Sequence, residues 1–153
     1  MEYRDETTSI QGSWPLEQWH WKHEMSVLAR TFLEALKDKR IIGLKCPGCG
    51  LVYVPPKPYC RCLAIPDEWV EVKDTALITT YTFTGSWSFG GMLEGSGAPM
   101  IIAGVMYDGS DTQTLTVLDG AEPEQVAVGK RTRVKWPENP QGGIDDIMHS
   151  ELI

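Results

Sequence analysis

The sequence predicts a mainly β protein of the α+β class, built from three consecutive parts and a tail. The first observation is a helical period of apolar side chains near the N-terminus, at Met25, Leu28, Phe32 and Leu36. The second is that all four cysteines lie within seventeen residues. The third is a series of five short segments rich in β-branched and aromatic residues between residues 67 and 137. A chain of 153 residues can bury one moderate core around these parts.

Residues 1–40 are predicted to form an N-terminal helical segment. The helical pattern runs from Pro15 to Arg40, either as one helix or as two shorter helices with a break near His23. Cations lie in its last turn, and Gly43 is a stop signal. Three tryptophans open this segment, and they either pack on the chain's own barrel or anchor another subunit: Trp14, Trp19 and Trp21. His20 and His23 lie one helical turn apart, but without a third ligand they are interpreted as a solvated face.

Residues 41–66 are predicted to form a small metal-binding ribbon. Its donors are arranged as C-P-x-C-G followed by C-x-C, and they are Cys46, Cys49, Cys60 and Cys62. Four thiolates can occupy the corners of a tetrahedron around a zinc ion, about 2.3 Å from the metal. Gly48 and Gly50 permit the positive φ angles that a turn around a ligating cysteine needs. The interpretation is a rubredoxin-like ribbon with structural Zn²⁺, and iron or two disulfides are the alternatives.

Residues 67–137 are predicted to form a five-stranded barrel of the OB-fold type. The expected strands are Trp69–Lys73, Leu77–Thr84, Met100–Tyr107, Gln113–Leu118 and Arg131–Trp136. Asp-Gly pairs after the third and fourth of these strands indicate tight turns. Short strands without a long intervening helix are typical of a small closed or partly open barrel. Residues 138–153 are predicted to be a C-terminal tail.

The charge distribution argues against a nucleic-acid binder. The formal net charge is −7, and because residues 1–45 carry seven acids and seven bases, the imbalance lies in residues 46–153. Affinity for nucleic acids comes mainly from Lys and Arg neutralising phosphates. No apolar run approaches the ~20 residues needed to span a bilayer, and the polar N-terminus is unlike a signal peptide. The chain is therefore expected to be cytoplasmic.

The order of helix, ribbon and barrel resembles the DUF35 family. The residues that carry the resemblance are Cys46-Pro-Gly-Cys49-Gly50, then Val54-Pro55-Pro56-Lys57, then the second cysteine pair. Residues 101–107 and 128–134 are similar to the family's barrel strand before a D-G turn and its glycine-led last strand. The resemblance covers roughly residues 28–137. The departure is the C-x-C pair, which is one residue shorter than the family's common spacing.

The resemblance implies a function that composition does not show. DUF35 proteins are typically small subunits that accompany thiolases or related acyl-CoA enzymes, and the partner carries the catalytic cysteine. The chain is therefore expected to be a non-catalytic accessory subunit of a thiolase-like acyl-CoA C-acyltransferase. In this hetero-oligomer it would help to accommodate a coenzyme A thioester. Degradation of a bulky or aromatic acyl-CoA is one specific form of this hypothesis.

The residues themselves indicate no independent active site. Four thiolates would close the coordination shell of zinc, whereas a catalytic zinc keeps one position open. His149 is interpreted as an isolated residue of the tail, and the basic group at residues 130–135 as a balance for the acidic barrel.

Two further groups of residues are candidate contacts with the ligand or the partner. Lys57 and Arg61 are candidates for binding the phosphates of coenzyme A. The long glycine-rich segment 85–97 is a candidate partner or ligand loop, or else a plain insertion. Its candidate contact residues are Trp87, Phe89, Gly90 and Gly91.

Two other functions remain open. A stand-alone OB-fold protein that binds single-stranded nucleic acid would use aromatic stacking and a basic groove. A rubredoxin-like electron carrier would hold iron and would be red.

Overall fold

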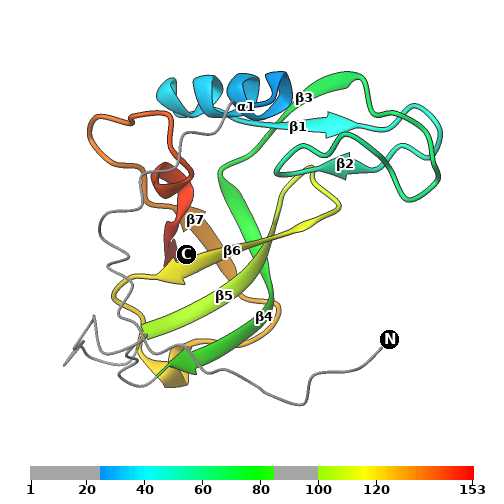
Figure 1. Ribbon diagram of the computed structural model, residues 1–153. Helices are drawn as coiled ribbons and strands as arrows, with labels where there is room; N and C mark the ends of the chain where they lie inside the picture. Colours follow the sequence, from blue (N-terminus) through cyan, green and yellow to red (C-terminus); the bar gives the residue numbers. More distant parts are fainter. Residues whose placement is uncertain (1–24, 85–99) are drawn as a thin grey trace, which may run out of the picture.

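A computed structural model of the chain describes residues 25–84 and 100–153. Within these residues one α-helix precedes eight strands, and a short 3-10 helix lies on either side of β7 (Figure 1). The helical elements are α1 Val27–Lys37, η2 Pro123–Gln125 and η3 Ile144–Ile147. The strands are β1 Ile41–Lys45, β2 Val52–Tyr53, β3 Glu68–Val72, β4 Thr75–Thr84, β5 Met100–Tyr107, β6 Gln113–Leu118, β7 Arg131–Val134 and β8 His149–Leu152. The mainly β fold class predicted from the sequence is confirmed.

Helix α1 lies within the predicted helical pattern, of which residues 15–24 fall outside the described residues. It begins after Ser26, whose side chain accepts a hydrogen bond from the amide of Ala29 at 3.2 Å. Phe32 and Leu36 are buried, but Met25 precedes the helix and is exposed, so the predicted apolar stripe starts later than expected. The helix ends at Lys37 rather than Arg40, because the chain reverses at Lys39 with a φ of 55°. The three tryptophans and the two histidines before Met25 lie outside the described residues.

The ribbon contributes a three-stranded sheet in the order β2-β1-β3. The sequence predicts Trp69–Lys73 as the first barrel strand, but this prediction is wrong. The strand found there, β3, pairs antiparallel with β1 along its whole length, from Ile41 opposite Val72 to Lys45 opposite Glu68. The β propensity of this segment was recognised correctly, but propensity does not specify which neighbour a strand pairs with.

The barrel is closed, with the strand order β4-β5-β6-β8-β7. Strands β4, β5 and β6 form an antiparallel meander. Strand β7 pairs antiparallel with β4, and β8 pairs parallel to β6 and antiparallel to β7. This is a Greek-key barrel of the OB type. Its fifth strand is β8, in the segment that the sequence predicts as a tail, so that prediction is corrected. Thr116 secures the closure by donating to the Met148 carbonyl at 3.1 Å and by a 2.9 Å hydrogen bond with the Ser150 hydroxyl.

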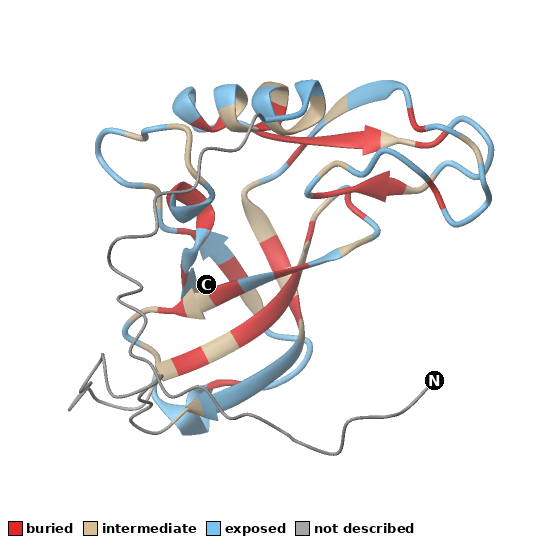
Figure 2. Ribbon diagram, viewed as in Figure 1, coloured by how far each residue is buried: buried red, intermediate tan, exposed pale blue. Residues whose placement is uncertain are grey.

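Ribbon and barrel share one hydrophobic core. Buried side chains from α1, the ribbon and the barrel belong to the same cluster, among them Phe32, Leu36, Ile41, Val54, Val72, Ile78, Val105 and Ile147. Figure 2 shows buried residues in the helix, in the ribbon sheet and along the strands of the barrel. The ribbon is therefore packed against the barrel rather than attached by a linker.

No described helix is long and apolar enough to cross a membrane.

Candidate metal centre

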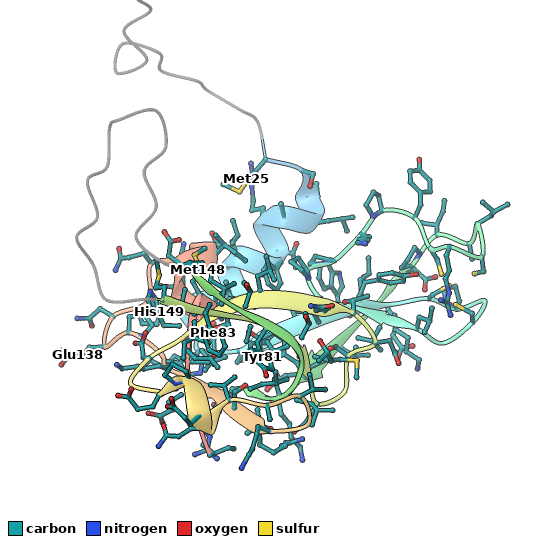
Figure 3. All side chains as sticks on the ribbon, turned by 90° about the horizontal axis from the view of Figure 1, so that it is seen from below. Met25, Tyr81, Phe83, Glu138, Met148 and His149 are labelled. Carbon is teal, nitrogen blue, oxygen red and sulfur yellow. The ribbon has the colours of Figure 1, made fainter. Side chains whose placement is uncertain are left out.

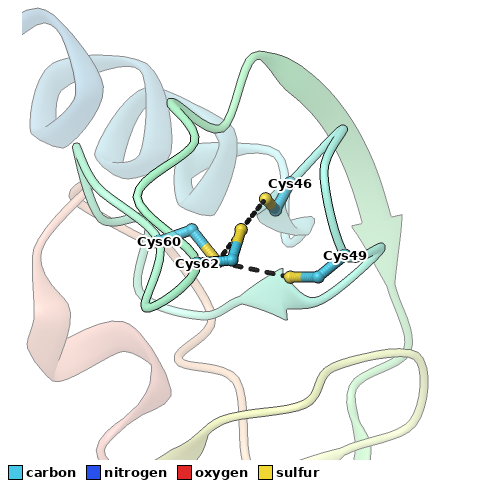
Figure 4. A group of neighbouring side chains, drawn as sticks. All are labelled: Cys46, Cys49, Cys60 and Cys62. Carbon is cyan, nitrogen blue, oxygen red and sulfur yellow. Dashed lines mark hydrogen bonds between the residues drawn. The ribbon is translucent and has the colours of Figure 1, made fainter.

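The four cysteines converge at the outer end of the ribbon (Figure 4). Cys46 and Cys49 lie in the turn after β1, and Cys60 and Cys62 lie in the loop between β2 and β3. All four Sγ atoms lie within 4.8 Å of one another. The Sγ–Sγ distances are 3.5 Å for Cys46–Cys62, 3.3 Å for Cys49–Cys60 and 3.4 Å for Cys60–Cys62.

These distances fit a tetrahedral zinc site. With zinc–sulfur bonds of about 2.3 Å, the edges of a thiolate tetrahedron are roughly 3.8 Å long. None of the four cysteines forms a disulfide in this structure, and the convergence of all four sulfurs favours a metal site over two disulfides. Both sulfurs of the shortened C-x-C pair belong to the cluster. The donor set suits a structural metal, since four sulfurs occupy all four corners.

Two turns of similar construction carry the two cysteine pairs. In the first, the amide of Gly50 donates to the carbonyl of Cys46 at 2.8 Å, and the amide of Cys46 donates to the carbonyl of Leu51 at 2.9 Å. In the second, Leu63 donates to Cys60 at 2.9 Å, and Cys60 donates to the carbonyl of Ala64 at 3.0 Å. The missing residue of C-x-C therefore shortens the second turn without abolishing it.

The glycine of the first turn has an unexpected counterpart in the second. Gly50 has the positive φ that the sequence predicts, 76°, and Leu63 takes the corresponding place with a φ of 68°. A leucine at positive φ is strained, and its side chain is 90% exposed. Gly48 does not have a positive φ, so this part of the prediction is wrong. It makes room instead, because a Cβ there would lie 3.3 Å from the Cys62 sulfur and 3.1 Å from the Ala64 Cβ.

Hydrogen bonds give the thiols different acidities. The pKa of the Cys60 thiol is lowered to about 6, first by the amide of Cys62 and then by the hydroxyl of Tyr53, both of which donate to its sulfur. The pKa of the Cys49 thiol is raised to about 12. The amide of Leu51 lowers it, but hydrogen bonds with the other thiols and partial burial outweigh that effect. Cys60 is thus the most acidic of the thiols whose pKa is shifted. This favours metal binding, because the thiolate is the form that binds a metal.

The two candidate residues for coenzyme A lie close to the cysteines. The Nζ atom of Lys57 lies 5.7 Å from the centre of the Tyr53 ring, which is a cation–π distance. Arg61 separates Cys60 from Cys62, and both basic residues are exposed. The other predicted contact residues, Trp87, Phe89, Gly90 and Gly91, lie outside the described residues.

Three basic or histidine residues of the barrel have partners. His149 is not isolated, because its Nδ1 atom lies 2.9 Å from a carboxylate oxygen of Asp119. Lys135 contacts the same carboxylate at 3.0 Å, and Arg131 forms an ion pair with Asp108. Half of the basic group predicted at residues 130–135 is thus neutralised locally. This supports its interpretation as a balance for acidic side chains.

Tyr53 is a site residue that sequence reasoning missed. It lies between the two cysteine pairs in the sequence, and its hydroxyl lies 3.1 Å from the Cys60 sulfur. Its place beside Cys60 follows from the pairing of β1 with β2, in which Leu44 lies opposite Tyr53. A seven-residue separation across three prolines gives no sequence signal for this contact.

A cysteine ribbon packed on a five-stranded OB-type barrel defines a class of protein, the zinc-ribbon proteins with an OB-like barrel. Comparison with protein families places a match to "ChsH2, rubredoxin-like zinc ribbon domain" at residues 33–64. A crystal structure of a DUF35-family protein of unknown function from Sulfolobus solfataricus is similar. It has 25% identity and a TM-score of 0.63 over 83% of this chain and 86% of that chain.

A second similar structure is "Ltp2-ChsH2(DUF35) aldolase", with 20% identity and a TM-score of 0.60 over 86% of this chain and 97% of that chain. A comparison with curated proteins finds no match. The ribbon match and the two similar structures confirm the predicted resemblance to the DUF35 family. The ribbon match and the four-cysteine cluster also support structural zinc.

Proposed function

We propose that this protein is the non-catalytic, zinc-binding accessory subunit of a thiolase-like acyl-CoA C-acyltransferase. The observation that carries the proposal is the cysteine cluster. Its four sulfurs are close enough to bind one zinc ion and leave no corner of the tetrahedron for a substrate. The zinc ligands would be Cys46, Cys49, Cys60 and Cys62, and the ion would cross-link the two turns of the ribbon. The chemistry then belongs to the partner, and this chain completes the complex.

One of the two similar structures supports a partnership. It is named "Ltp2-ChsH2(DUF35) aldolase", which pairs Ltp2 with the DUF35 protein ChsH2. The surface of the chain also offers apolar contacts. A pocket of about 240 Å³ lies between α1 and the prolines that separate the two cysteine pairs. It is lined mostly by apolar groups, among them Phe32, Leu33, Pro55 and Pro56. We include this apolar pocket in the surface proposed to contact the partner.

A second apolar feature lies at the far end of the barrel. Tyr81 and Phe83 form an edge-to-face pair with ring centres 5.4 Å apart, and they are 37% and 46% exposed. Figure 3 looks onto this side of the molecule. Strand β4 leads from these rings into the predicted partner loop at residues 85–97. We include this loop, with Trp87 and Phe89, in the surface proposed to contact the partner or its ligand.

The partnership is tested by purifying the tagged chain from its native host under mild conditions and identifying co-purified proteins by mass spectrometry. A near-stoichiometric thiolase-like enzyme is the expected result. Reconstituted with this chain, that enzyme should cleave acyl-CoA substrates, bulky or aromatic ones in particular. A chain that purifies alone would contradict the proposal. A chain that binds single-stranded DNA in a salt-dependent manner would favour the nucleic-acid alternative.

The metal is tested on the same preparation. One zinc per chain in a colourless protein is expected, whereas a red protein with iron would favour the electron carrier. The free cysteines agree with a reducing compartment, and we place the complex in the cytoplasm.

The coenzyme A contact is tested by charge reversal in the complex. We propose that Lys57 and Arg61 bind phosphates of coenzyme A, because both cations are exposed on one loop of the ribbon. The double variant Lys57→Glu/Arg61→Glu should weaken acyl-CoA binding by the complex about tenfold or more, that is by about 1.4 kcal/mol. The matched control, Lys73→Glu/Lys130→Glu, changes the net charge equally and should leave the affinity unchanged. Equal affinities for both double variants would contradict this role.

A further inference from the structure

Tyr53 presents a buried hydroxyl to the cysteine cluster. Its side chain is 6% exposed and packs in a small apolar cluster with Cys46 and Cys60. A buried hydroxyl requires hydrogen-bond partners, since burial without them is costly. Two partners lie within reach: the backbone amide of Arg61 at 3.4 Å and the sulfur of Cys60 at 3.1 Å.

The roles of donor and acceptor follow from counting protons. The amide of Arg61 can only donate, so the Tyr53 oxygen accepts this hydrogen bond. The hydroxyl has one proton of its own, and the remaining neighbour is the Cys60 sulfur. A zinc-ligating cysteine is a thiolate, which has no proton to offer. The hydroxyl of Tyr53 therefore donates to the sulfur of Cys60.

Cys60 needs such a donor more than its neighbour in the C-x-C pair. Cys60 is buried, whereas Cys62 and Cys49 are exposed and can be solvated by water. Four thiolates and one Zn²⁺ sum to a charge of −2, and negative charge in a buried position is stabilised by directed hydrogen bonds. The same hydroxyl also holds the amide of Arg61, the residue inside the shortened pair.

From this geometry we infer that Tyr53 is a positioning residue of the metal centre. Its hydroxyl donates to the Cys60 thiolate, accepts from the Arg61 amide and so holds the one-residue-short C-x-C pair in ligating position. Hydrogen-bond partners of this kind orient metal ligands and raise metal affinity. The inference rests on the zinc-binding part of the proposed function and is independent of the partner enzyme.

The test is the variant Tyr53→Phe in the full-length chain, which keeps the ring and removes the hydroxyl. Zinc affinity is measured by competition with a chromogenic chelator, and the sulfur-to-metal charge-transfer bands are recorded after cobalt substitution. We expect one zinc per chain in both proteins, a 10- to 100-fold weaker affinity in Tyr53→Phe, and shifted bands. The control Tyr59→Phe removes a hydroxyl from another tyrosine between the two cysteine pairs, one that is 70% exposed, and it should behave as wild type.

Two results would overturn the inference. The first is an affinity of Tyr53→Phe within twofold of wild type with unchanged cobalt bands. The second is a loss of zinc affinity from Tyr53→Phe that is as large in a Cys60→Ser background as in the wild-type background. If the hydroxyl acts through the Cys60 sulfur, its removal should have a smaller effect when that sulfur is absent. A wild-type chain that does not bind one zinc would instead contradict the proposed function itself.

The unmodified chain offers an independent measurement, should Tyr53→Phe fail to fold. Replacing zinc by cadmium lengthens the metal–sulfur bonds and changes the charge on the sulfurs while keeping four thiolate ligands. In the nuclear magnetic resonance spectrum of a chain labelled with ¹³C at the tyrosine ring carbon that carries the oxygen, the Tyr53 signal should shift on this exchange. The Tyr59 signal should not. A Tyr53 signal that stays in place overturns the inference.

Discussion

Asp108 is a residue whose charge joins two strands of the barrel. It follows β5, and its carboxylate accepts hydrogen bonds from the Arg131 guanidinium of β7, one of them at 2.8 Å, and from the Thr75 hydroxyl of β4. The hydrogen bonds from Arg131 hold the pKa of Asp108 below its usual value, with Thr75 assisting and burial opposing. The cluster therefore closes the β4–β7 side of the barrel in a pH-dependent way.

The variant Asp108→Asn should flatten the acid branch of the stability curve. Because the pKa is lower in the folded than in the unfolded state, the carboxylate stabilises the fold fully above the unfolded value of about 3.9. This contribution is lost as the pH falls through the folded value. Urea unfolding at pH 6 and pH 3 should show a smaller drop in the free energy of unfolding for Asp108→Asn than for wild type. At pH 7 the variant should be less stable by about 1 kcal/mol, a value reduced for partial exposure.

A matched control separates this cluster from carboxylates in general. Asp67 is exposed and has no side-chain hydrogen bond among the described residues. Asp67→Asn should therefore keep the wild-type pH dependence. If Asp108→Asn follows the wild-type curve as well, the Arg131 pair contributes nothing measurable to acid stability.

At the residue scale, the sequence predicts the metal ligands but not the groups that support them. Four soft donors within seventeen residues are recognisable because their spacing along the chain is itself the signal. Tyr53 and Leu63 are not recognisable in this way. The Tyr53 hydroxyl is brought to Cys60 by the pairing of β1 with β2. The positive φ of Leu63 belongs to a turn like the one in which Gly50 has a positive φ.

At the scale of elements, the loop before η3 shows how a polar segment is held against α1. The buried carboxylate of Asp146 accepts hydrogen bonds from three successive amides, those of Gln141, Gly142 and Gly143, at 3.2, 2.7 and 3.1 Å. Gly142 has a φ of 74°, and a Cβ there would lie 2.8 Å from the carbonyl oxygen of Leu33 in α1. This loop leads through η3 into β8, the strand that closes the barrel.

The variant Gly142→Ala should therefore destabilise the fold by about 2 to 3 kcal/mol. Part of the cost is the left-handed backbone, about 1 to 2 kcal/mol for a residue with a Cβ. The rest is the displacement of the loop from the backbone of α1. The measurement is the free energy of unfolding from urea titration at saturating zinc.

Gly120→Ala is the matched control for this prediction. Gly120 has a φ of 66°, but a Cβ there would meet nothing within 4 Å. Gly120→Ala should lower the free energy of unfolding by only about 1 kcal/mol, because only the backbone conformation opposes the substitution. Equal losses in the two variants would show that contact with α1 does not matter at Gly142.

Strand β8 explains why the barrel could not be completed from sequence. Its four residues, His-Ser-Glu-Leu, have little β propensity and only a weak alternation. They become a strand because the edges of β6 and β7 offer unpaired backbone groups on either side. The partners of β3 likewise depend on which sheet edge is available. By contrast β5 and β6 each carry a long apolar or alternating pattern, and both were predicted with the bounds observed.

At the scale of the whole molecule, ribbon and barrel are tied by a ladder of hydrogen bonds between residues 52–54 and 111–114. Val52 exchanges two bonds with Asp111, each of 2.9 Å. The amide of Val54 donates to the Thr112 hydroxyl at 2.8 Å, and the Val54 carbonyl accepts from the hydroxyls of Thr112 and Thr114 at 2.9 and 3.1 Å. The ribbon thus extends the β5–β6 hairpin of the barrel and shares its core.

This connection predicts how zinc removal spreads through the molecule. Metal binding contributes much of the folding energy of small ribbons, so a chelator should loosen the turns at residues 46–50 and 60–64 first. The loosening should then reach the hairpin at residues 111–114 through the ladder. Strands β7 and β8 are bonded to neighbours on both sides within the closed barrel and should stay protected. Hydrogen exchange measured by mass spectrometry, with and without the chelator, follows each of these segments.

The pattern of exchange decides between two views of the molecule. Faster exchange in residues 41–66 and 111–114, with β7 and β8 unchanged, is expected if the barrel is stable by itself and the ribbon depends on the metal. The variant Cys49→Ser should reproduce this pattern without a chelator, because it removes one corner of the tetrahedron. Equal loss of protection in β7 and β8 would show instead that the shared core makes ribbon and barrel one cooperative unit. Unchanged exchange in the ribbon would mean that zinc does not stabilise it.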